Sequence, residues 1–185
     1  MPPSTAASPR RRAAGSRLDR LARLRVPIGF ACGVVALILA HPTVASLVVG
    51  GAVAAAGEGL RFWAAGHLEK GREVTKSGPY RWSRHPLYVG SSIIGLGVAI
   101  ASASIGVLIL AAAYLIVSLT AAIRSEEAAL TAKFGREYAD YREGRLTDVS
   151  RRFSLARALA NREPRAVAGM AAGWALLALK LVLRV

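Results

Sequence analysis

The sequence predicts an all-α protein, a polytopic membrane helical bundle of four to five transmembrane helices with its N-terminus in the cytoplasm. Hydrophobic residues make up 54% of the chain even with its 18 glycines left out, whereas about 45–50% is usual for soluble domains with glycine counted. The charges sum to +14 and fall in blocks separated by long apolar stretches. The single cysteine, Cys32, excludes a disulfide framework and a multi-cysteine zinc site, and we expect no metal.

Five apolar stretches are candidates for the helices. They cover residues 26–40, 44–57, 87–103, 105–123 and 166–183. A spanning helix needs about 17–25 residues, which residues 105–123 supply outright and 87–103 just supply. Residues 44–57 reach that length only by continuing through Glu58 and Arg61 to residue 65.

The first and last stretches are less simple. Pro42 ends the first one early, so it crosses only a thin bilayer, with Arg25 reaching back to the headgroups. The last one either spans, which places Lys180 and Arg184 outside, or lies in the membrane interface.

The distribution of basic residues predicts the orientation. Of the 25 Lys and Arg, 23 lie in residues 1–25, 61–84 and 124–165, and none lies in the turns at 41–43 and 102–104. Positively charged loops stay on the cytoplasmic side. The sequence therefore predicts two tight hairpins in a multi-pass integral membrane protein of the plasma (inner) membrane, with the active site facing the cytoplasm. A soluble helical bundle is the alternative, but two nearly uncharged helices joined by so short a turn argue against it.

Three regions follow from this pattern. Residues 1–20 are predicted to be a disordered basic tail, 21–142 the membrane core, and 143–185 a basic linker with the fifth apolar helix. Because the charges follow membrane sidedness, we expect membrane lipids as partners and no nucleic acid.

Several charged residues lie where the apolar stretches end, and charges at membrane depth often mark function. Glu58 and Arg61 are three residues apart, so they can pair, either as an ordinary ion pair at the headgroups or in a site. Arg124 and Glu127 likewise share a helix face, while Glu126 points elsewhere. Acids are unfavourable at a helix C-terminus, so either this helix continues into the cytosol or the acids have a cationic partner.

The loop before the third helix predicts an anion-binding corner. Pro86 suits the first helical position, which places His85 at the cap. The free N–H groups of that helix start, with Arg81 and Arg84, would attract an anion. A basic aromatic loop that anchors to headgroups is the alternative, although it leaves the His-Pro pair unexplained.

The stretch from about residue 57 to 142 resembles the integral-membrane methyltransferases of the isoprenylcysteine carboxyl methyltransferase and phospholipid methyltransferase superfamily. The resemblance rests on Gly-Leu-Arg-Phe-Trp-Ala at 59–64, Ser-Gly-Pro-Tyr-Arg at 77–81, Arg-His-Pro-Leu-Tyr-Val-Gly at 84–90, Arg-Ser-Glu-Glu at 124–127, and Phe-Gly-Arg-Glu-Tyr at 134–138. These motifs cover about half of the chain.

The resemblance implies the cofactor S-adenosylmethionine and a lipid-like or small hydrophobic methyl acceptor. The cofactor-binding residues that it implies are Arg84, His85, Tyr88, Gly90, Glu126, Glu127 and Tyr138. The residues that it implies at the methyl-transfer centre are Arg124, Glu127 and Arg61, the last on the acceptor side. The acceptor group stays open between an amine, a carboxylate and a thiol, and an amine would need a base such as Glu58 or Glu127.

A different class of function is a non-catalytic membrane scaffold or anionic-lipid-binding protein. The net positive charge supports this alternative, because a basic residue near an anionic membrane surface contributes about 1 kcal/mol to binding.

Overall fold

The computed structural model describes residues 27–145 and 151–183. Its helices are Pro27–Leu39, α2 (Val44–His67), the 3-10 turn η1 (Gly78–Arg81), α3 (Pro86–Ser102), α4 (Ile105–Phe134), α5 (Arg136–Arg142), α6 (Leu155–Ala160) and α7 (Glu163–Leu183). The described residues contain no strand, which confirms the all-α prediction. The predicted tail at 1–20 and the linker residues 146–150 lie outside the described residues.

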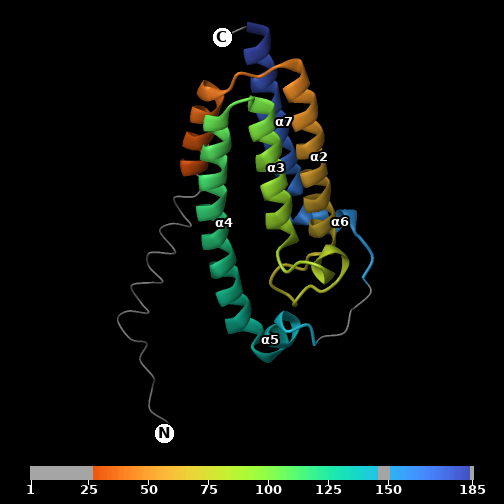
Figure 1. Cartoon of the computed structure of the whole chain (residues 1–185). Helices are drawn as coiled ribbons and strands as arrows, with labels where there is room; N and C mark the ends of the chain where they lie inside the picture. Colours follow the sequence, from red (N-terminus) through yellow and green to blue (C-terminus); the bar gives the residue numbers. More distant parts are fainter. Residues whose placement is uncertain (1–26, 146–150, 184–185) are drawn as a thin grey trace, which may run out of the picture.

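Two hairpins form the bundle, and their short turns meet at one end of it (Figure 1). Thr43 starts α2 with a capping box, in which its side chain accepts from the Ser46 amide and the Ser46 side chain accepts from the Thr43 amide. Ala103 ends α3 in a left-handed conformation, with φ 46°. The His41 amide donates to the Ser102 carbonyl at 2.7 Å, which fastens the two turns to each other.

Small residues let α2 and α3 approach backbone to backbone. A Cβ at Gly50 would lie 2.5 Å from the Gly97 carbonyl oxygen, and one at Gly57 would lie 2.8 Å from the Gly90 carbonyl oxygen. Such small-residue interfaces are typical of helix pairs in membranes, where close van der Waals packing replaces the hydrophobic effect. This contact fixes the start of α3 against the last turns of α2.

Because of this close approach, we expect Gly57→Ala to lower the free energy of unfolding by about 1–3 kcal/mol. Gly59 lies two residues further along α2 with nothing within 4 Å of its Cβ position. Gly59→Ala should therefore stabilise the helix by up to about 1 kcal/mol through helix propensity alone. Thermal unfolding of the two variants in detergent measures the difference, and equal shifts would contradict the close α2–α3 packing.

The outer faces of the helices are apolar, as expected for a protein in lipid. Large exposed side chains include Phe30, Val48, Ile109, Ile116 and Val182, whereas many of the buried hydrophobic residues are alanines, such as Ala40 and Ala101. By length and composition α2, α4 and α7 are long enough to cross a membrane, while α3 and the helix Pro27–Leu39 are shorter. The number of spans stays a prediction.

The last helix, α7, lies along α2 and not across the end of the bundle (Figure 1). Trp174 packs at Gly51 and donates to the Leu47 carbonyl at 3.4 Å. The Lys180 ammonium donates to the Leu37 and Ile38 carbonyls, both at 2.8 Å, and so satisfies the last carbonyl groups of the first helix. This placement favours spanning over an interfacial position for residues 166–183.

Candidate active site

The polar segments gather at the end of the bundle opposite the short turns. The loop after α2, η1, α5 and α6 all lie there, and α4 extends into this region (Figure 1). Ion pairs and hydrogen bonds hold the loop in place: Lys133 donates to the Gly71 carbonyl, and Lys76 binds Glu137 of α5 at 3.0 Å. The helix that carries Glu126 and Glu127 runs to Phe134, past the predicted span at 105–123, which agrees with the first of the two alternatives given for these acids.

Glu126 and Glu127 also have cationic partners, which was the second alternative. His85 Nε2 lies 3.3 Å from Glu127 Oε1, and His85 Nδ1 lies 3.8 Å from Glu126 Oε2. Arg84 Nη1 is 3.3 Å from the same Glu127 oxygen. We call these four residues the acid–histidine corner. It joins the start of α3 to the polar half of α4, and its His85 side chain is only 13% exposed.

Tyrosines surround this corner. The Tyr88 ring stacks on His85 with centroids 5.6 Å apart, and the Tyr88 hydroxyl hydrogen-bonds Glu126. Tyr138 of α5 is 2% exposed, and its hydroxyl has no hydrogen-bond partner among the described residues. Burial raises the pKa of Tyr138, and the neighbouring Glu127 adds to the shift. The corner thus has a buried hydroxyl beside it that is available to a ligand.

Two further tyrosines, Tyr80 and Tyr141, lie near the corner, and neither was among the predicted site residues. Tyr141 donates from its hydroxyl to the Tyr80 carbonyl at 2.8 Å, which connects α5 to η1. Burial raises the pKa of Tyr80 well above its usual range, with Glu126 contributing.

The charge state of His85 offers a direct check on this geometry. The Glu126 carboxylate beside the ring raises the pKa of His85 above 6.5, against the opposing effect of burial, and Glu127 adds to the rise. A raised pKa means that the protonated imidazole stabilises the fold fully below pH 6.5, and that this contribution is lost as pH rises through the folded-state value. We expect an NMR titration to give a value above 6.5 that falls in Glu126→Gln. An unchanged value in that variant would contradict the contact.

The start of α3 offers fewer free N–H groups than the sequence predicted. The Tyr88 and Val89 amides donate to the His85 carbonyl at 3.0 and 3.1 Å, and Pro86 has no N–H. The positive side of the corner is therefore supplied mainly by the Arg84 and His85 side chains.

Three of the predicted site residues lie elsewhere. Arg124 is exposed and pairs with none of the described residues. Gly90 packs inside the α2–α3 interface, where a Cβ would lie 2.5 Å from Arg61 Cγ. Arg61 itself contacts the Leu87 carbonyl and the Ser91 hydroxyl at the first turns of α3.

Arg61 belongs to a second, buried cluster with Glu58, Ser91 and Glu163. Its Nη2 binds both Glu163 oxygens at 3.0 Å, whereas its Nε lies 3.7 Å from Glu58. The predicted Glu58–Arg61 pair is thus present but secondary. Sequence reasoning missed Glu163, because the fifth apolar stretch was taken to begin after it. An acid at the first turn of an apolar helix is the signal that could have identified it.

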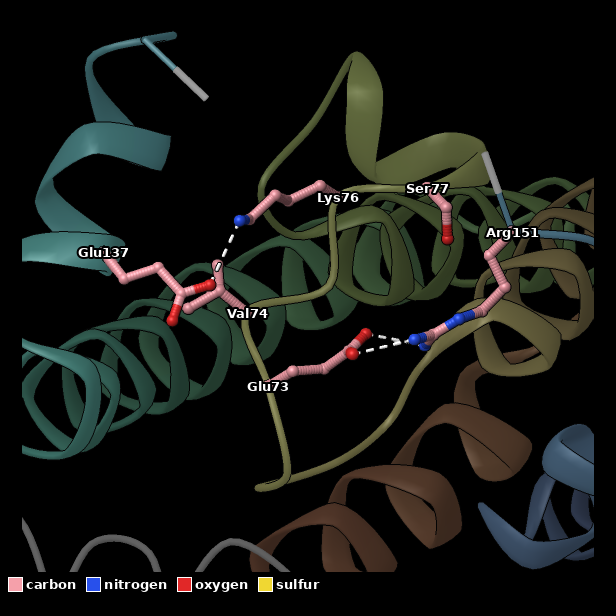
Figure 2. Close-up of a pocket in the computed structure, with 6 residues that line it drawn as sticks. All are labelled: Glu73, Val74, Lys76, Ser77, Glu137 and Arg151. Carbon is pink, nitrogen blue, oxygen red and sulfur yellow. Dashed lines mark hydrogen bonds and ion pairs between the residues drawn. The ribbon is translucent and has the colours of Figure 1, made fainter. Parts of the chain in front are cut away.

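A small pocket lies beside the loop, between α5 and the segment before α6 (Figure 2). Its volume is about 120 Å³. It is lined on two sides by ion pairs, Lys76–Glu137 and Arg151–Glu73. Pockets for ligands of cofactor size measure about 300–1,000 Å³. The size and balanced charges of this pocket indicate a role in holding the loop, not a cofactor site.

Comparisons with known proteins agree with the motifs that meet at the corner. A family model described as phospholipid methyltransferase matches residues 30–137, more than half of the chain. The match includes both halves of the acid–histidine corner and ends one residue before Tyr138. No curated protein and no solved structure matches the chain. The chain therefore belongs to the phospholipid methyltransferase family, whose members are membrane methyltransferases.

Proposed function

We propose that this protein transfers a methyl group from S-adenosylmethionine to a lipid-like or small hydrophobic acceptor at the cytoplasmic face of the plasma (inner) membrane. The observation that carries the proposal is the meeting of His85 with Glu126 and Glu127 across α3 and α4. In this proposal residues 21–142 form the catalytic core, and residues 143–185 support it through α7.

The donors and acceptors at the corner suit the groups of this cofactor, which carries a carboxylate, an ammonium, a ribose diol and a sulfonium. Glu126 and Glu127 suit the ammonium and the ribose hydroxyls, because ionised acceptors make the stronger hydrogen bonds. Arg84 and His85 suit the carboxylate. The unpartnered buried Tyr138 hydroxyl provides one more donor or acceptor at the same place.

When bound, S-adenosylmethionine supplies an electrophilic methyl group on sulfur. The task of the chain is then alignment more than acid–base catalysis, since holding two reactants in line lowers the barrier by itself. Tyr88 and His85, stacked on each other, form a rigid edge of the corner. Glu127 is the base that we propose for an amine acceptor, because it lies in the corner whereas Glu58 lies in the other cluster.

The proposed roles of the three outlying residues differ. The Arg124 side chain is free to guide an anionic acceptor arriving from the bilayer. Gly90 acts by letting α2 and α3 touch, which fixes the start of α3. Arg61 remains a proposal for the acceptor side, through its hold on the Leu87 carbonyl and Ser91 at the first turns of α3.

Membranes carrying the protein test the proposal. They are incubated with S-adenosylmethionine labelled in its methyl group, and lipid and small-molecule extracts are analysed by mass spectrometry. We expect label in one class of hydrophobic product with the wild type and none with His85→Ala at equal protein level. Label that is identical in both, or absent from both although the cofactor binds, would contradict the proposal.

A further inference from the structure

A second pocket, larger than the one in Figure 2, lies at the end of α2. Its volume is about 390 Å³, within the range for ligands of metabolite size. It is lined by Trp63, His67, Gly78, Arg81, Arg151 and Arg152. These residues come from three separate segments: the last turn of α2, η1 and the stretch before α6. None of them belongs to the acid–histidine corner.

The charges around this pocket select an anion. Three of its six lining residues are arginines, and none is an acid. Arg151 is fixed by Glu73, which lies outside the pocket, and reaches the His67 carbonyl at 3.5 Å. Arginine guanidinium groups recognise phosphate with paired N–H donors. S-adenosylmethionine, with a net positive charge, is a poor ligand for such a lining.

The aromatic side chains around the pocket are of the kind found at a membrane interface. Trp82 is 77% exposed and packs edge to face on Trp63 with centroids 5.6 Å apart. Phe153 packs on Phe62 at 5.9 Å and on His67 at 6.4 Å. Tryptophan and basic residues concentrate where an apolar helix meets the headgroup layer, and α2 changes from apolar residues to the basic loop at this point.

We propose that this pocket binds the phosphate of an anionic membrane lipid, with the headgroup among Arg81, Arg151 and Arg152 and the acyl chains along the apolar face of α2. Basic pockets beside membrane helices on the cytoplasmic side are typical sites for anionic headgroups. The aromatic wall and the position at the end of a membrane helix favour a lipid over free phosphate as the source of the anion. The site is separate from the one proposed for methyl transfer.

Native mass spectrometry of the purified protein in detergent, with phosphatidylglycerol or phosphatidylcholine added, tests this site without any cofactor or methyl acceptor. We expect preferential retention of phosphatidylglycerol by the wild type. The Arg81→Gln/Arg152→Gln double variant should bind it at least tenfold more weakly, since each arginine near an anionic headgroup contributes about fivefold. The matched control is Arg72→Gln/Arg136→Gln, which removes the same charge at side chains that are 84% and 95% exposed outside the pocket.

Three results would overturn the proposal. Equal weakening in the two double variants would assign the binding to net charge. Equal retention of the two lipids would assign it to groups that both lipids share and not to the net negative charge of the headgroup. Displacement of phosphatidylglycerol by millimolar inorganic phosphate would assign the pocket to the free anion.

Far-ultraviolet circular dichroism establishes that the double variants remain folded. A further variant, Trp63→Leu, removes an aromatic side chain of the pocket but no charge. It should weaken lipid retention while keeping the preference for phosphatidylglycerol.

Discussion

Replacing Glu127 with glutamine is expected to lower methyl transfer by about 10- to 100-fold while leaving the bundle folded. The change removes the negative charge that faces both His85 Nε2 and Arg84 Nη1 at 3.3 Å. A hydrogen bond to a charged group is worth about 1.5–3 kcal/mol, which corresponds to this range of rates. Initial rates with labelled cofactor, normalised to folded protein, measure the effect.

The matched control for this variant is Glu137→Gln. Glu137 lies at the same polar end, in α5, and pairs with Lys76 while its side chain is 46% exposed. We expect its rate to stay within about twofold of the wild type, because exposed ion pairs contribute about 0–1 kcal/mol. Similar losses in both glutamine variants would mean that the acid–histidine corner has no special role.

Replacing Arg61 with alanine is expected to lower the free energy of unfolding by about 3–5 kcal/mol, the usual effect of removing one partner of a buried ion pair. Glu163 and Glu58 are 4% and 6% exposed, so the variant would leave two buried carboxylates without a counter-charge. The links from α2 to Ser91 of α3 and to α7 would be lost as well. Thermal unfolding in detergent measures the change.

Glu163→Gln separates two roles of Arg61, namely support of the bundle and orientation of the acceptor. It keeps the side-chain volume and a hydrogen-bond acceptor, so it should destabilise the protein less than Arg61→Ala does. If Arg61 acts only by supporting the bundle, both variants lose activity in step with the folded fraction. If Arg61 also orients the acceptor, Arg61→Ala raises the apparent KM for the acceptor in protein that is still folded.

The local features of the fold could be predicted from the sequence, because each is determined by neighbouring residues. The apolar stretches, the uncharged turns and the position of Pro86 at the start of α3 all follow from composition and proline chemistry. The contact of His85 with the two acids needed the family motifs in addition, since 41 and 42 positions separate them in the chain.

The parts that could not be predicted depend on long-range packing. Glu163 pairs with Arg61 across 102 positions, and no spacing rule connects them. Gly90 was expected to line the cofactor site, but its role depends on how closely α2 approaches, which only the packed pair of helices reveals. The exposed position of Arg124 likewise follows from the rotation of α4 about its axis and not from its place beside Glu127 in the motif.

Photo-crosslinking of S-adenosylmethionine to the wild-type protein, followed by peptide mapping, tests the central claim most directly. The account predicts that the label maps to peptides that contain Tyr88 or Tyr138, beside the acid–histidine corner, and that excess unlabelled cofactor prevents the reaction. Label concentrated instead on the peptide that contains Trp63, or on α7, would show that the cofactor binds elsewhere and would contradict the account.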